Sequence, residues 1–481
     1  MSSCVPVPQR TWKAGTAPGI FPSVAHGIAL FRRPLDFLNN LSAHGDLVEI
    51  RLGPTRAWVA CHPELVHEML RDTRTFDKGG PLYERLRALM GDGVVTCPHH
   101  DHRRQRRLLQ PAFRPSRVAE QTDAMGEEAE SVCGAWRAGE RVDVSAAMMT
   151  LTTGAVSRVL FSDALDAART AEVRDCLAAV VHGLFVRTVV PVDALFRVPT
   201  PANRRYRDAV RRLHALVDTA VAERRAGEER DDLLGTLLAA ADDGEQAVTG
   251  REVHDQLVSL LLTGSESPSL CLSSTFSLLA RHPEAERRLH EEVDTVLAGR
   301  TRPTAEDLPH LVHTRAVIHE SLRHSPPGWL FTRSTTREVE FGGRHLPRGA
   351  TVLYSPYLLH HASTSFPDPE RFLPERWLPG EDAGGPHGAM IPFSAGSRKC
   401  LGDAFAMAQT TVALATIARR WRLRHPPGPV AAVRPAVTLG PRTLPMICEP
   451  RAHGLADPPA ATGSRPRRAA TAPGAQQSGK G

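Results

Sequence analysis

The sequence has no closely spaced cysteine pairs. Eight cysteines are spread over 481 residues, and none of them belongs to a C-x-x-C pair. That spacing argues against a disulfide framework and against a structural zinc site. We therefore expect a protein of a reducing compartment, the cytoplasm, whose fold depends on a hydrophobic core.

Long hydrophobic runs are also missing. No apolar stretch approaches the roughly 18 residues needed to cross a bilayer, and the apolar residues 27–31 follow no basic cluster. We expect no membrane anchor and no signal peptide. Residues 1–20 are polar and interrupted by prolines, which predicts an irregular N-terminal segment.

Positive charge is concentrated at one end of the chain. The net charge is +6, and +4 of it lies in residues 451–481, from Arg451, Arg465, Arg467, Arg468 and Lys480 against Asp457. The charge of residues 1–450 is nearly balanced, so the net positive charge does not indicate nucleic-acid binding. Residues 451–481 also lack periodic apolar positions, which predicts a disordered tail.

The apolar pattern predicts one mainly α-helical domain with a minor β-sheet over residues 21–450. Helical periodicity dominates from about residue 64 to 323, whereas the apolar segments 47–52 and 57–60 flank Gly53-Pro54 and predict a hairpin. A period near two over residues 328–357 predicts further strands. The stretch from there to Gly396 is dense in proline and glycine, and loops of that length are usually functional.

One cysteine lies in a distinctive loop, FSAGSRKCLGDAFA, over residues 393–406. Gly396 and Gly402 allow the backbone to turn and to approach a flat group closely. Two cations precede Cys400, and an apolar stripe after it predicts a helix that begins at or near the cysteine. Helix amides and cations would favour thiolate over thiol. Such a thiolate could bind metal or act as a nucleophile, although a lone cysteine is more often inert.

The loop matches F-x-x-G-x-R-x-C-x-G, the haem-binding signature of the cytochrome P450 family, at every fixed position, through Phe393, Gly396, Arg398, Cys400 and Gly402. Over roughly residues 20–450 the chain resembles the soluble bacterial haem-thiolate monooxygenases of that family. The resemblance implies haem b (iron protoporphyrin IX) between a long distal helix and the cysteine loop, with Cys400 as axial iron ligand and Arg398 at a propionate. Thiolate donation favours cleavage of the oxygen–oxygen bond.

Two further patterns resemble the family's supporting residues. Glu320 and Arg323 share a helical face and match its E-x-x-R pair, with Arg376 as third partner and Arg371 as a competing match. By resemblance this group is structural and holds the haem loop.

His102 and Arg106 share a face and match the H-x-x-x-R arrangement that binds propionates, and Arg333 matches a strand arginine that completes it. The alternative for residues 102–107 is a basic surface helix. We assign His102 and Arg106 inward and the remaining arginines outward, where they would attract an acidic electron donor.

A nearly all-apolar helix with polar residues in its middle is predicted from about residue 251 to 281. Proline at 268 cannot donate to the carbonyl of Gly264, so the helix should kink or open there. Gly264 and Glu266 match the family's oxygen-binding groove, and Ser267 stands where threonine is usual. By resemblance these three residues are catalytic and relay protons, although serine lacks the methyl that fixes its rotamer.

By resemblance, five segments should face the substrate: residues 78–95, 180–195, 260–263, 328–331 and 438–442. Leu184, Phe185, Trp329, Leu330 and Phe331 make them apolar, although each is individually more often ordinary core. A hydrophobic small molecule is therefore expected, oxidised by O2 at a C–H or C=C bond. Residues 75–113 are similar to bacterial members that oxidise terpenoids, pentalenene oxygenases among them. Electrons should come from a separate ferredoxin or flavodoxin with its reductase, and we expect a monomer.

Three other functions fit parts of the pattern: peroxide-driven oxidation, a haem-thiolate rearrangement without net hydroxylation, and a non-catalytic haem-binding sensor. Glu266 and Ser267 argue against the peroxide-driven reaction, and a sensor would need neither them nor an activating thiolate. The unusual Ser267-Pro268 pair leaves a rearrangement open. Dependence on a reductase and oxygen isotope in the product distinguish these functions.

Overall fold

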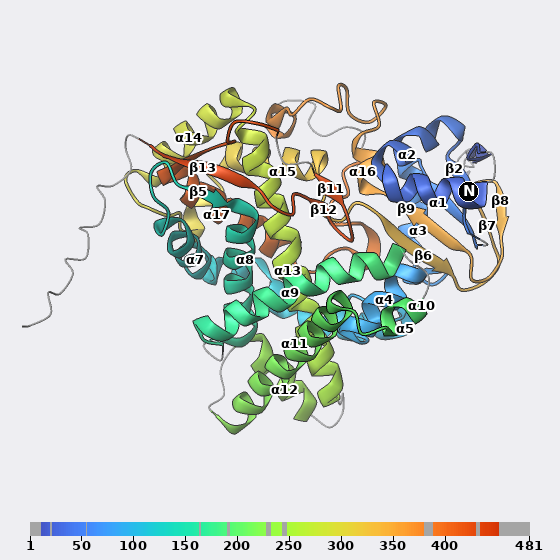
Figure 1. The fold of residues 1–481 in the computed structure, drawn as a ribbon, viewed down its shortest axis with the longest axis horizontal. Helices are drawn as coiled ribbons and strands as arrows, with labels where there is room; N and C mark the ends of the chain where they lie inside the picture. The colour runs from blue at the N-terminus through green and yellow to red at the C-terminus, as the bar shows by residue number, and fades with distance from the viewer. Residues whose placement is uncertain are drawn as a thin grey trace, which may run out of the picture.

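Helices form most of the molecule, with a small sheet at one side of them (Figure 1). The computed structural model describes residues 11–19, 22–53, 55–162, 165–189, 193–227, 232–242, 248–379, 388–429 and 433–451. The α-helices are α1 (Pro22–Arg32), α2 (Pro34–Leu41), α3 (Pro63–Arg71), α4 (Pro81–Met90), α5 (His99–Leu109), α6 (Pro115–Glu120), α7 (Thr122–Gly134), α8 (Val144–Phe161), α9 (Ala167–Val189), α10 (Asp193–Arg197), α11 (Pro201–Ala226), α12 (Leu233–Asp242), α13 (Gly250–Leu279), α14 (Pro283–Leu297), α15 (Val312–His324), α16 (Pro356–His360) and α17 (Asp403–Arg420). The 3₁₀ turns are η1 (Ser42–His44), η2 (Gln110–Phe113), η4 (Ala305–Asp307), η5 (Pro374–Trp377) and η6 (Gly396–Arg398). The predicted mainly helical class is confirmed.

The main sheet has the strand order β1-β2-β3-β9-β6-β4. Its strands are β1 (Ala14–Thr16), β2 (Leu47–Leu52), β3 (Thr55–Ala60), β4 (Phe76–Asp77), β6 (Phe331–Thr335) and β9 (Thr351–Tyr354). The predicted hairpin is confirmed, since β2 and β3 pair antiparallel with Val48 opposite Val59. Strand β9 then pairs parallel to β3, which brings the late strands onto the early ones.

Part of the N-terminal segment is regular. Strand β1 pairs parallel to β2, so the predicted irregular structure of residues 1–20 is wrong for residues 14–16. A Cβ on Gly15 would lie 2.0 Å from the carbonyl oxygen of His44, so glycine permits this close pairing. Residues 1–10 and the predicted tail after Arg451 lie outside the described residues.

Three smaller sheets complete the strands. The first has the order β10-β13-β5, and the others pair β11 with β12 and β7 with β8. Their strands are β5 (Arg141–Asp143), β7 (Val339–Phe341), β8 (Arg344–Leu346), β10 (Trp421–Arg424), β11 (Arg434–Pro435), β12 (Leu439–Gly440) and β13 (Pro445–Pro450).

Helix α13 runs through the middle of the helical part (Figure 1). It begins at Thr249, whose side chain accepts from the Glu252 amide, and it continues through Pro268. Hydroxyl groups supply extra donors to carbonyls near the proline: Thr152 donates to Ser265 and Ser269 donates to Glu266, both at 2.8 Å. The predicted central helix is therefore present and continues through Pro268. The kink or opening at Pro268 stays a prediction.

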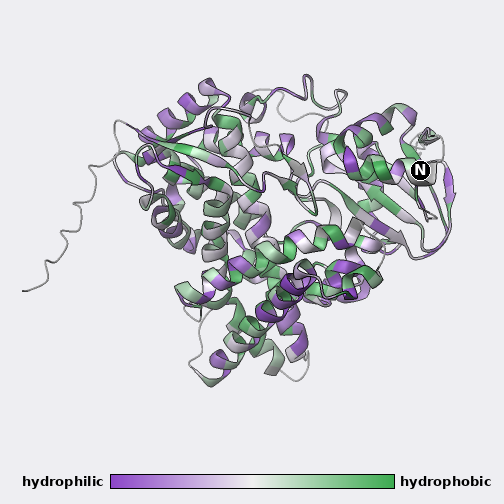
Figure 2. Cartoon of the chain, viewed as in Figure 1, coloured by the Kyte–Doolittle hydropathy of each residue, from purple (hydrophilic) through white to green (hydrophobic). Residues whose placement is uncertain are grey.

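Helix α8 is the main apolar neighbour of α13. Contrary to the expectation that the sequence holds no such run, α8 is long and apolar enough to cross a membrane, with a mean hydropathy of 1.3. Because 67% of these residues are buried inside the fold, α8 is better explained as a core helix. Figure 2 shows hydrophobic residues on the inner helices and hydrophilic residues along outer ones such as α14 and α11.

Candidate active site

A cavity of about 290 Å³ lies between α13 and the loop that carries Cys400. One side is lined by α13 residues from Leu260 to Cys271, and the other by residues 392–402 with the first turns of α17. Apolar residues of α8 complete the distal side, namely Val156, Val159 and Leu160. The predicted distal helix and the predicted cysteine loop therefore meet at one cavity.

The cysteine loop turns sharply at two residues with left-handed backbone conformations. Ser394 has φ = 60° and Gly396 has φ = 71°. A Cβ on Gly396 would lie 2.1 Å from the carbonyl oxygen of Leu70, so only glycine fits there. The Cys400 amide donates to the carbonyl of Phe393 at 2.9 Å and closes the loop.

Cys400 borders the cavity just before α17, which begins at Asp403 because Gly402 has non-helical backbone angles. Burial is the largest influence on the Cys400 thiol and raises its pKa, whereas the Gly402 amide, Arg106 and Lys78 lower it. The amide and the cations therefore favour thiolate, as the sequence predicts, but burial acts against them. The exposed surface of this cysteine opens into the cavity, so a stable thiolate requires a cation bound at the sulfur.

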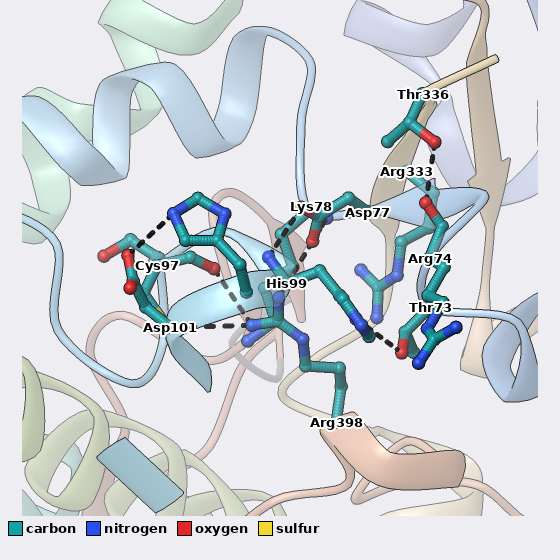
Figure 3. A network of polar contacts seen from close by, with 12 residues as sticks. Thr73, Arg74, Asp77, Lys78, Cys97, His99, Asp101, Arg333, Thr336 and Arg398 are labelled. Carbon is teal, nitrogen blue, oxygen red and sulfur yellow. Dashed lines mark hydrogen bonds and ion pairs between the residues drawn. The ribbon is translucent and has the colours of Figure 1, made fainter. Parts of the chain in front are cut away.

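Buried cations cluster beside the cysteine loop (Figure 3). The Arg398 side chain is 1% exposed and donates to Asp77 at 2.8 Å and to the carbonyl of Cys97 at 3.0 Å. Lys78 donates to a backbone carbonyl at 2.7 Å. Burial, followed by the charges of Arg398 and Arg333, lowers the pKa of Lys78 to about 7.

Arg333 on β6 is the most completely buried of these cations, at 1% exposure. Its guanidinium lies 3.3 Å from the Tyr83 hydroxyl and 3.4 Å from the Tyr354 hydroxyl. Within the described ranges, no carboxylate forms an ion pair with it. The Nε atoms of Arg333 and Arg398 are both buried without a hydrogen-bond partner.

Two residues of α5 extend the cluster, as the sequence predicted for their positions. His102 is 6% exposed, and burial, then Arg398 and Lys78, lower its pKa to about 3. Arg106 donates to the carbonyl of Lys399 at 2.6 Å and lines the cavity. The remaining arginines of this helix are exposed, and Arg104 pairs with Glu252 at 2.7 Å.

This arrangement fits a haem. Buried cations are costly unless they are paired and hydrogen-bonded, and the two haem propionates would supply the missing negative charge to the Nε atoms of Arg333 and Arg398. The thiol of Cys400, whose pKa is raised by burial, would gain the bound cation that a thiolate needs. Of the eight residues predicted to bind the cofactor, seven line the cavity, and Gly396 turns the loop behind them.

The sequence prediction missed three polar residues of this cluster. Lys78, Tyr83 and Tyr354 all line the cavity. Lys78 and Tyr83 lie in a segment predicted only to face the substrate, and Tyr354 carries no motif. Tyr354 and Lys78 come together through the pairing of β4, β6 and β9, which no local pattern specifies.

The distal polar residues point in different directions. Gly264 and Ser267 line the cavity, and a Cβ on Gly264 would lie 3.0 Å from Val156. Glu266 is not among the described lining residues. Its side chain is 6% exposed and accepts from Thr438 at 2.9 Å and from Arg442 at 3.3 Å. The predicted groove is therefore divided between two faces of α13.

The Glu320–Arg323 pair is completely buried on α15. Both side chains are 0% exposed, and the Arg323 guanidinium donates to Glu320 at 2.8 and 2.9 Å. Trp377 donates to the same carboxylate at 2.8 Å, and Arg376 lies 3.6 Å from it. The competing arginine, Arg371, forms an ion pair with Asp368 and contributes its backbone carbonyl to Arg323.

Three of the five predicted substrate-facing segments reach the cavity. They contribute Lys78, Tyr83, Val94, Val95, Leu260, Thr263, Gly328 and Phe331. No described residue of 180–195 lines it, because Leu184 is buried in the core, and the side chain of Phe185 lies outside the described residues. Trp329 instead donates to the carbonyl of Ala436 at 3.0 Å, and the segment 438–442 contacts Glu266.

Comparison with known proteins agrees with this geometry. Residues 19–440 match the family model described as Cytochrome P450. The chain is 48% identical to "Cyclooctat-9-en-7-ol 5-monooxygenase" of Streptomyces melanosporofaciens, over 92% of this chain and 97% of the relative. It is 42% identical to "Pentalenene oxygenase" of Streptomyces avermitilis, over 93% of this chain and 99% of that protein.

A solved structure supports the fold. The "Crystal structure of cytochrome P450DA heme domain" aligns with a TM-score of 0.81 at 24% identity, over 92% of this chain and 99% of that chain. The matched family model spans both the cysteine loop and α13. This chain therefore belongs to the cytochrome P450 family.

Proposed function

We propose that this protein is a monooxygenase that inserts one oxygen atom of O2 into a C–H or C=C bond of a hydrophobic secondary metabolite, a terpenoid. The observation that carries the proposal is the apolar cavity that opens directly onto Cys400 and buried cations. Relatives at 42% to 48% identity are named for pentalenene and for cyclooctat-9-en-7-ol, which supports a terpenoid substrate.

Members of the family use haem b with a cysteine thiolate ligand, and the haem supplies O2 binding and cleavage of the oxygen–oxygen bond. Cys400 is the proposed ligand. Phe393, which lines the same cavity, would pack beside its sulfur, and Gly396 and Gly402 would let the loop approach the cofactor. The propionates would be held by His102, Arg106, Arg333 and Arg398, with Lys78 added from the structure. Glu320, Arg323 and Arg376 would hold the haem loop from behind, because all three meet at one buried carboxylate.

Distal residues would handle substrate and protons. Val156, Leu260 and Phe331 present apolar surface and exclude water from the substrate. Gly264 leaves space beside α13, and Ser267 lines the cavity, where its hydroxyl would donate a proton. Glu266 would supply protons to Ser267 from the other face of the helix.

Substrate class is tested by binding and product analysis. Cyclooctat-9-en-7-ol and pentalenene are titrated into the ferric protein, and a shift to high spin is expected for at least one terpenoid because it displaces water from the cavity. Turnover under isotopically labelled O2 should then place one labelled oxygen atom in the product. A product without the label would indicate a rearrangement, and absence of any spin shift with polycyclic terpenoids would contradict the substrate class.

A separate redox protein is required by the family, and we propose an acidic ferredoxin or flavodoxin with its reductase. A basic groove lies on the cysteine side of the molecule, lined by Arg74, His99, His100, Arg103, Arg107 and Ser397 among others. Charge complementarity there would steer an acidic donor toward the haem edge.

Docking is tested by charge reversal. Arg107→Glu should slow reduction by about tenfold at low ionic strength, and the difference should shrink as salt screens the charges. Arg348→Glu, an exposed arginine on the turn between β8 and β9, is the control and should reduce at the wild-type rate. Equal rates for all three proteins would contradict the proposed docking face.

We further propose that the protein works as a cytoplasmic monomer. The seven described cysteines are all free, which suits a reducing compartment. Size-exclusion chromatography with light scattering should give the mass of one chain, and a mass of two chains would contradict this.

A further inference from the structure

Glu266 is held by a turn whose contacting residues come 172 and 176 residues later in the chain. Thr438 and Arg442 both contact its Oε1 atom, at 2.9 Å and 3.3 Å. Glu266 directly precedes Ser267, which lines the cavity, yet its own carboxylate points toward this turn. The acid therefore lies between the cavity and the segment 438–442.

Arg442 connects this buried acid with solvent. The Arg442 side chain is 35% exposed, whereas that of Glu266 is 6% exposed. The turn is also pressed against α13, because a Cβ on Gly440 would lie 2.7 Å from Leu270. The amide of Leu439 donates to the carbonyl of Pro327 at 2.9 Å and fixes the same strand. These contacts keep the guanidinium beside the carboxylate.

We infer that Arg442 and Thr438 position Glu266 as the proton carrier between solvent and Ser267, with Arg442 marking the surface end of the route. This inference rests on the proposed function. Arg442 acts through Glu266, so it is a positioning residue. The carboxylate takes a proton from water beside Arg442, turns about its side-chain bonds toward the cavity, and gives that proton to the Ser267 hydroxyl as the hydroxyl donates its own.

The proton balance follows from the reaction. Each oxygen inserted into substrate consumes one O2, two electrons from the redox partner and two protons, and the second oxygen atom leaves as water. Each proton that crosses Glu266 returns it to the carboxylate form, ready for the next. No further oxidant or reductant is needed for this relay.

The electrostatics agree with this role. Burial raises the pKa of Glu266, and Arg442 and the Thr438 hydroxyl are the groups that lower it. Among the described residues, no other charged side chain contributes to this shift. Burial therefore makes this carboxyl bind a proton more readily than an exposed glutamate does, while its two partners oppose that effect.

The first test measures the carboxyl itself in the holoenzyme. Infrared difference spectra between wild type and Glu266→Gln isolate the carbonyl-stretch band of protonated Glu266 across a pH series. Arg442→Gln should move the titration midpoint upward by about one pH unit, since an opposite charge lowers a carboxyl pKa by about 1–3 units. Arg442→Lys should restore most of the shift. Thr438→Val, which removes one hydrogen bond, should give a smaller upward shift.

The second test measures how much of the reductant consumed ends as hydrogen peroxide. In Arg442→Gln, hydrogen peroxide released per reductant consumed should rise several-fold, because oxygen that is not protonated in time escapes reduced but uncleaved. Arg442→Lys should bring the ratio back. Arg424→Gln is the matched control: Arg424 is 28% exposed and pairs with the 7% exposed Glu286 at 2.7 Å, and neither residue is among those that line the cavity. The control should destabilise the fold without changing the peroxide ratio.

The two measurements test different parts of the proposal, namely the contact with Glu266 and the proton route. An unchanged midpoint in both Arg442→Gln and Thr438→Val would overturn the contact, and a shifted midpoint with an unchanged peroxide ratio would overturn the proton route. If Arg442→Gln does not fold, Thr438→Val alone decides both points. Neither measurement needs a terpenoid product, so failure to oxidise the proposed substrates would leave this inference standing.

Discussion

At the scale of single residues, the cavity is defined by buried cations that are incompletely paired: Arg398 forms an ion pair with Asp77, whereas Arg333 has no carboxylate partner among the described residues. Arg333 and Arg398 are each about 1% exposed and leave a buried Nε unsatisfied, and Lys78 lies beside them. An uncompensated buried cation costs several kcal/mol. The folded protein is therefore stabilised by negative charge at this position. A ligand with two carboxylates would supply that charge.

Lys78 makes cofactor binding depend on pH. Burial and the neighbouring arginines lower its pKa to about 7, so above pH 7 it is largely neutral and must take up a proton when a propionate binds. Haem affinity measured by transfer between the apoprotein and a competing haem-binding protein should therefore fall as pH rises from 7 to 9. Lys78→Met should bind haem about 10-fold to 100-fold more weakly at pH 6, the worth of one charged hydrogen bond, and should lose the pH dependence.

The exposed Lys13→Met is the control for that measurement and should bind haem as wild type does. A wild-type affinity that does not change between pH 6 and 9 would contradict the placement of Lys78.

Gly396 is the residue on which the shape of the cysteine loop depends. Gly396→Ala combines a strained positive φ with a 2.1 Å contact to Leu70, and should lower the free energy of unfolding by about 3 kcal/mol or more. Gly53→Ala is matched, because Gly53 has φ = 62° and no atom within 4 Å of its added Cβ. It should cost about 1 kcal/mol. Equal losses in urea titrations would show that the Leu70 contact is not tight.

At the scale of secondary-structure elements, α15 and η5 show how a helix anchors a loop. Glu320 accepts from Arg323, from Trp377 and from the amide of Leu373, so one buried carboxylate joins the helix to the segment before the cysteine loop. Such a group fixes the relative position of two elements that share no regular hydrogen bonding.

Glu320→Gln should therefore strongly lower the free energy of unfolding. It leaves the fully buried Arg323 without a counter-charge, which costs about 3–5 kcal/mol. Glu375→Gln is the control: this exposed residue pairs with Arg288 on the surface and should cost less than about 1 kcal/mol. Urea unfolding of both variants measures the difference, and a loss below 1 kcal/mol for Glu320→Gln would contradict the buried network.

Elements with strong local patterns could be predicted from the sequence, whereas those fixed by distant contacts could not. The apolar surface of α13 and the hairpin of β2 and β3 depend on residues close in sequence, and both were predicted. Strand β1 depends on pairing to β2 and on the small size of Gly15, so its three residues carry no pattern of their own. The sequence predicted that the helix after the cysteine loop begins at or near Cys400. Helix α17 begins at Asp403, because Gly402 adopts non-helical backbone angles.

The residues of the site also fall into two groups, those that a short motif predicts and those that only long-range contacts bring together. The cysteine loop and the Glu320–Arg323 pair are short motifs with fixed spacing, so their residues could be named in advance. Lys78 and Tyr354 reach the cavity only through the strand order of the main sheet, and the partner of Glu266 lies 170 or more residues later. These long-range contacts cannot be predicted from the local pattern of a single sequence.

At the scale of the whole molecule, buried histidines limit stability in acid. Burial lowers the pKa of five histidines outside the cavity: to about 3 for His290, His324 and His360, and to about 4 for His319 and His361. They are neutral in the folded protein and protonate on unfolding below pH 6.5. Stability is therefore complete above pH 6.5 and is lost as pH falls toward 4.

Each of these histidines lowers the free energy of unfolding by about 1.4 kcal/mol per pH unit, so together they can exceed a typical domain stability of about 5–15 kcal/mol within two to three units. His360→Gln should reduce the slope of stability against pH by one proton, because the His360 Nε2 accepts from the Ile391 amide at 2.9 Å and cannot protonate in place. Unfolding free energies measured from pH 7 to 5 would show this. An unchanged slope in the variant would refute it.

The whole fold serves to place one sulfur against a cofactor, and ligation of haem iron by Cys400 is the claim on which the rest depends. The reduced carbon-monoxide difference spectrum of haem-loaded wild type and Cys400→Ser tests it most directly. Wild type should show the long-wavelength Soret band of thiolate-ligated haem, and Cys400→Ser should lose that band while it keeps some haem through the cation cluster. Persistence of the same band in Cys400→Ser, or its absence in haem-loaded wild type, would contradict the assignment.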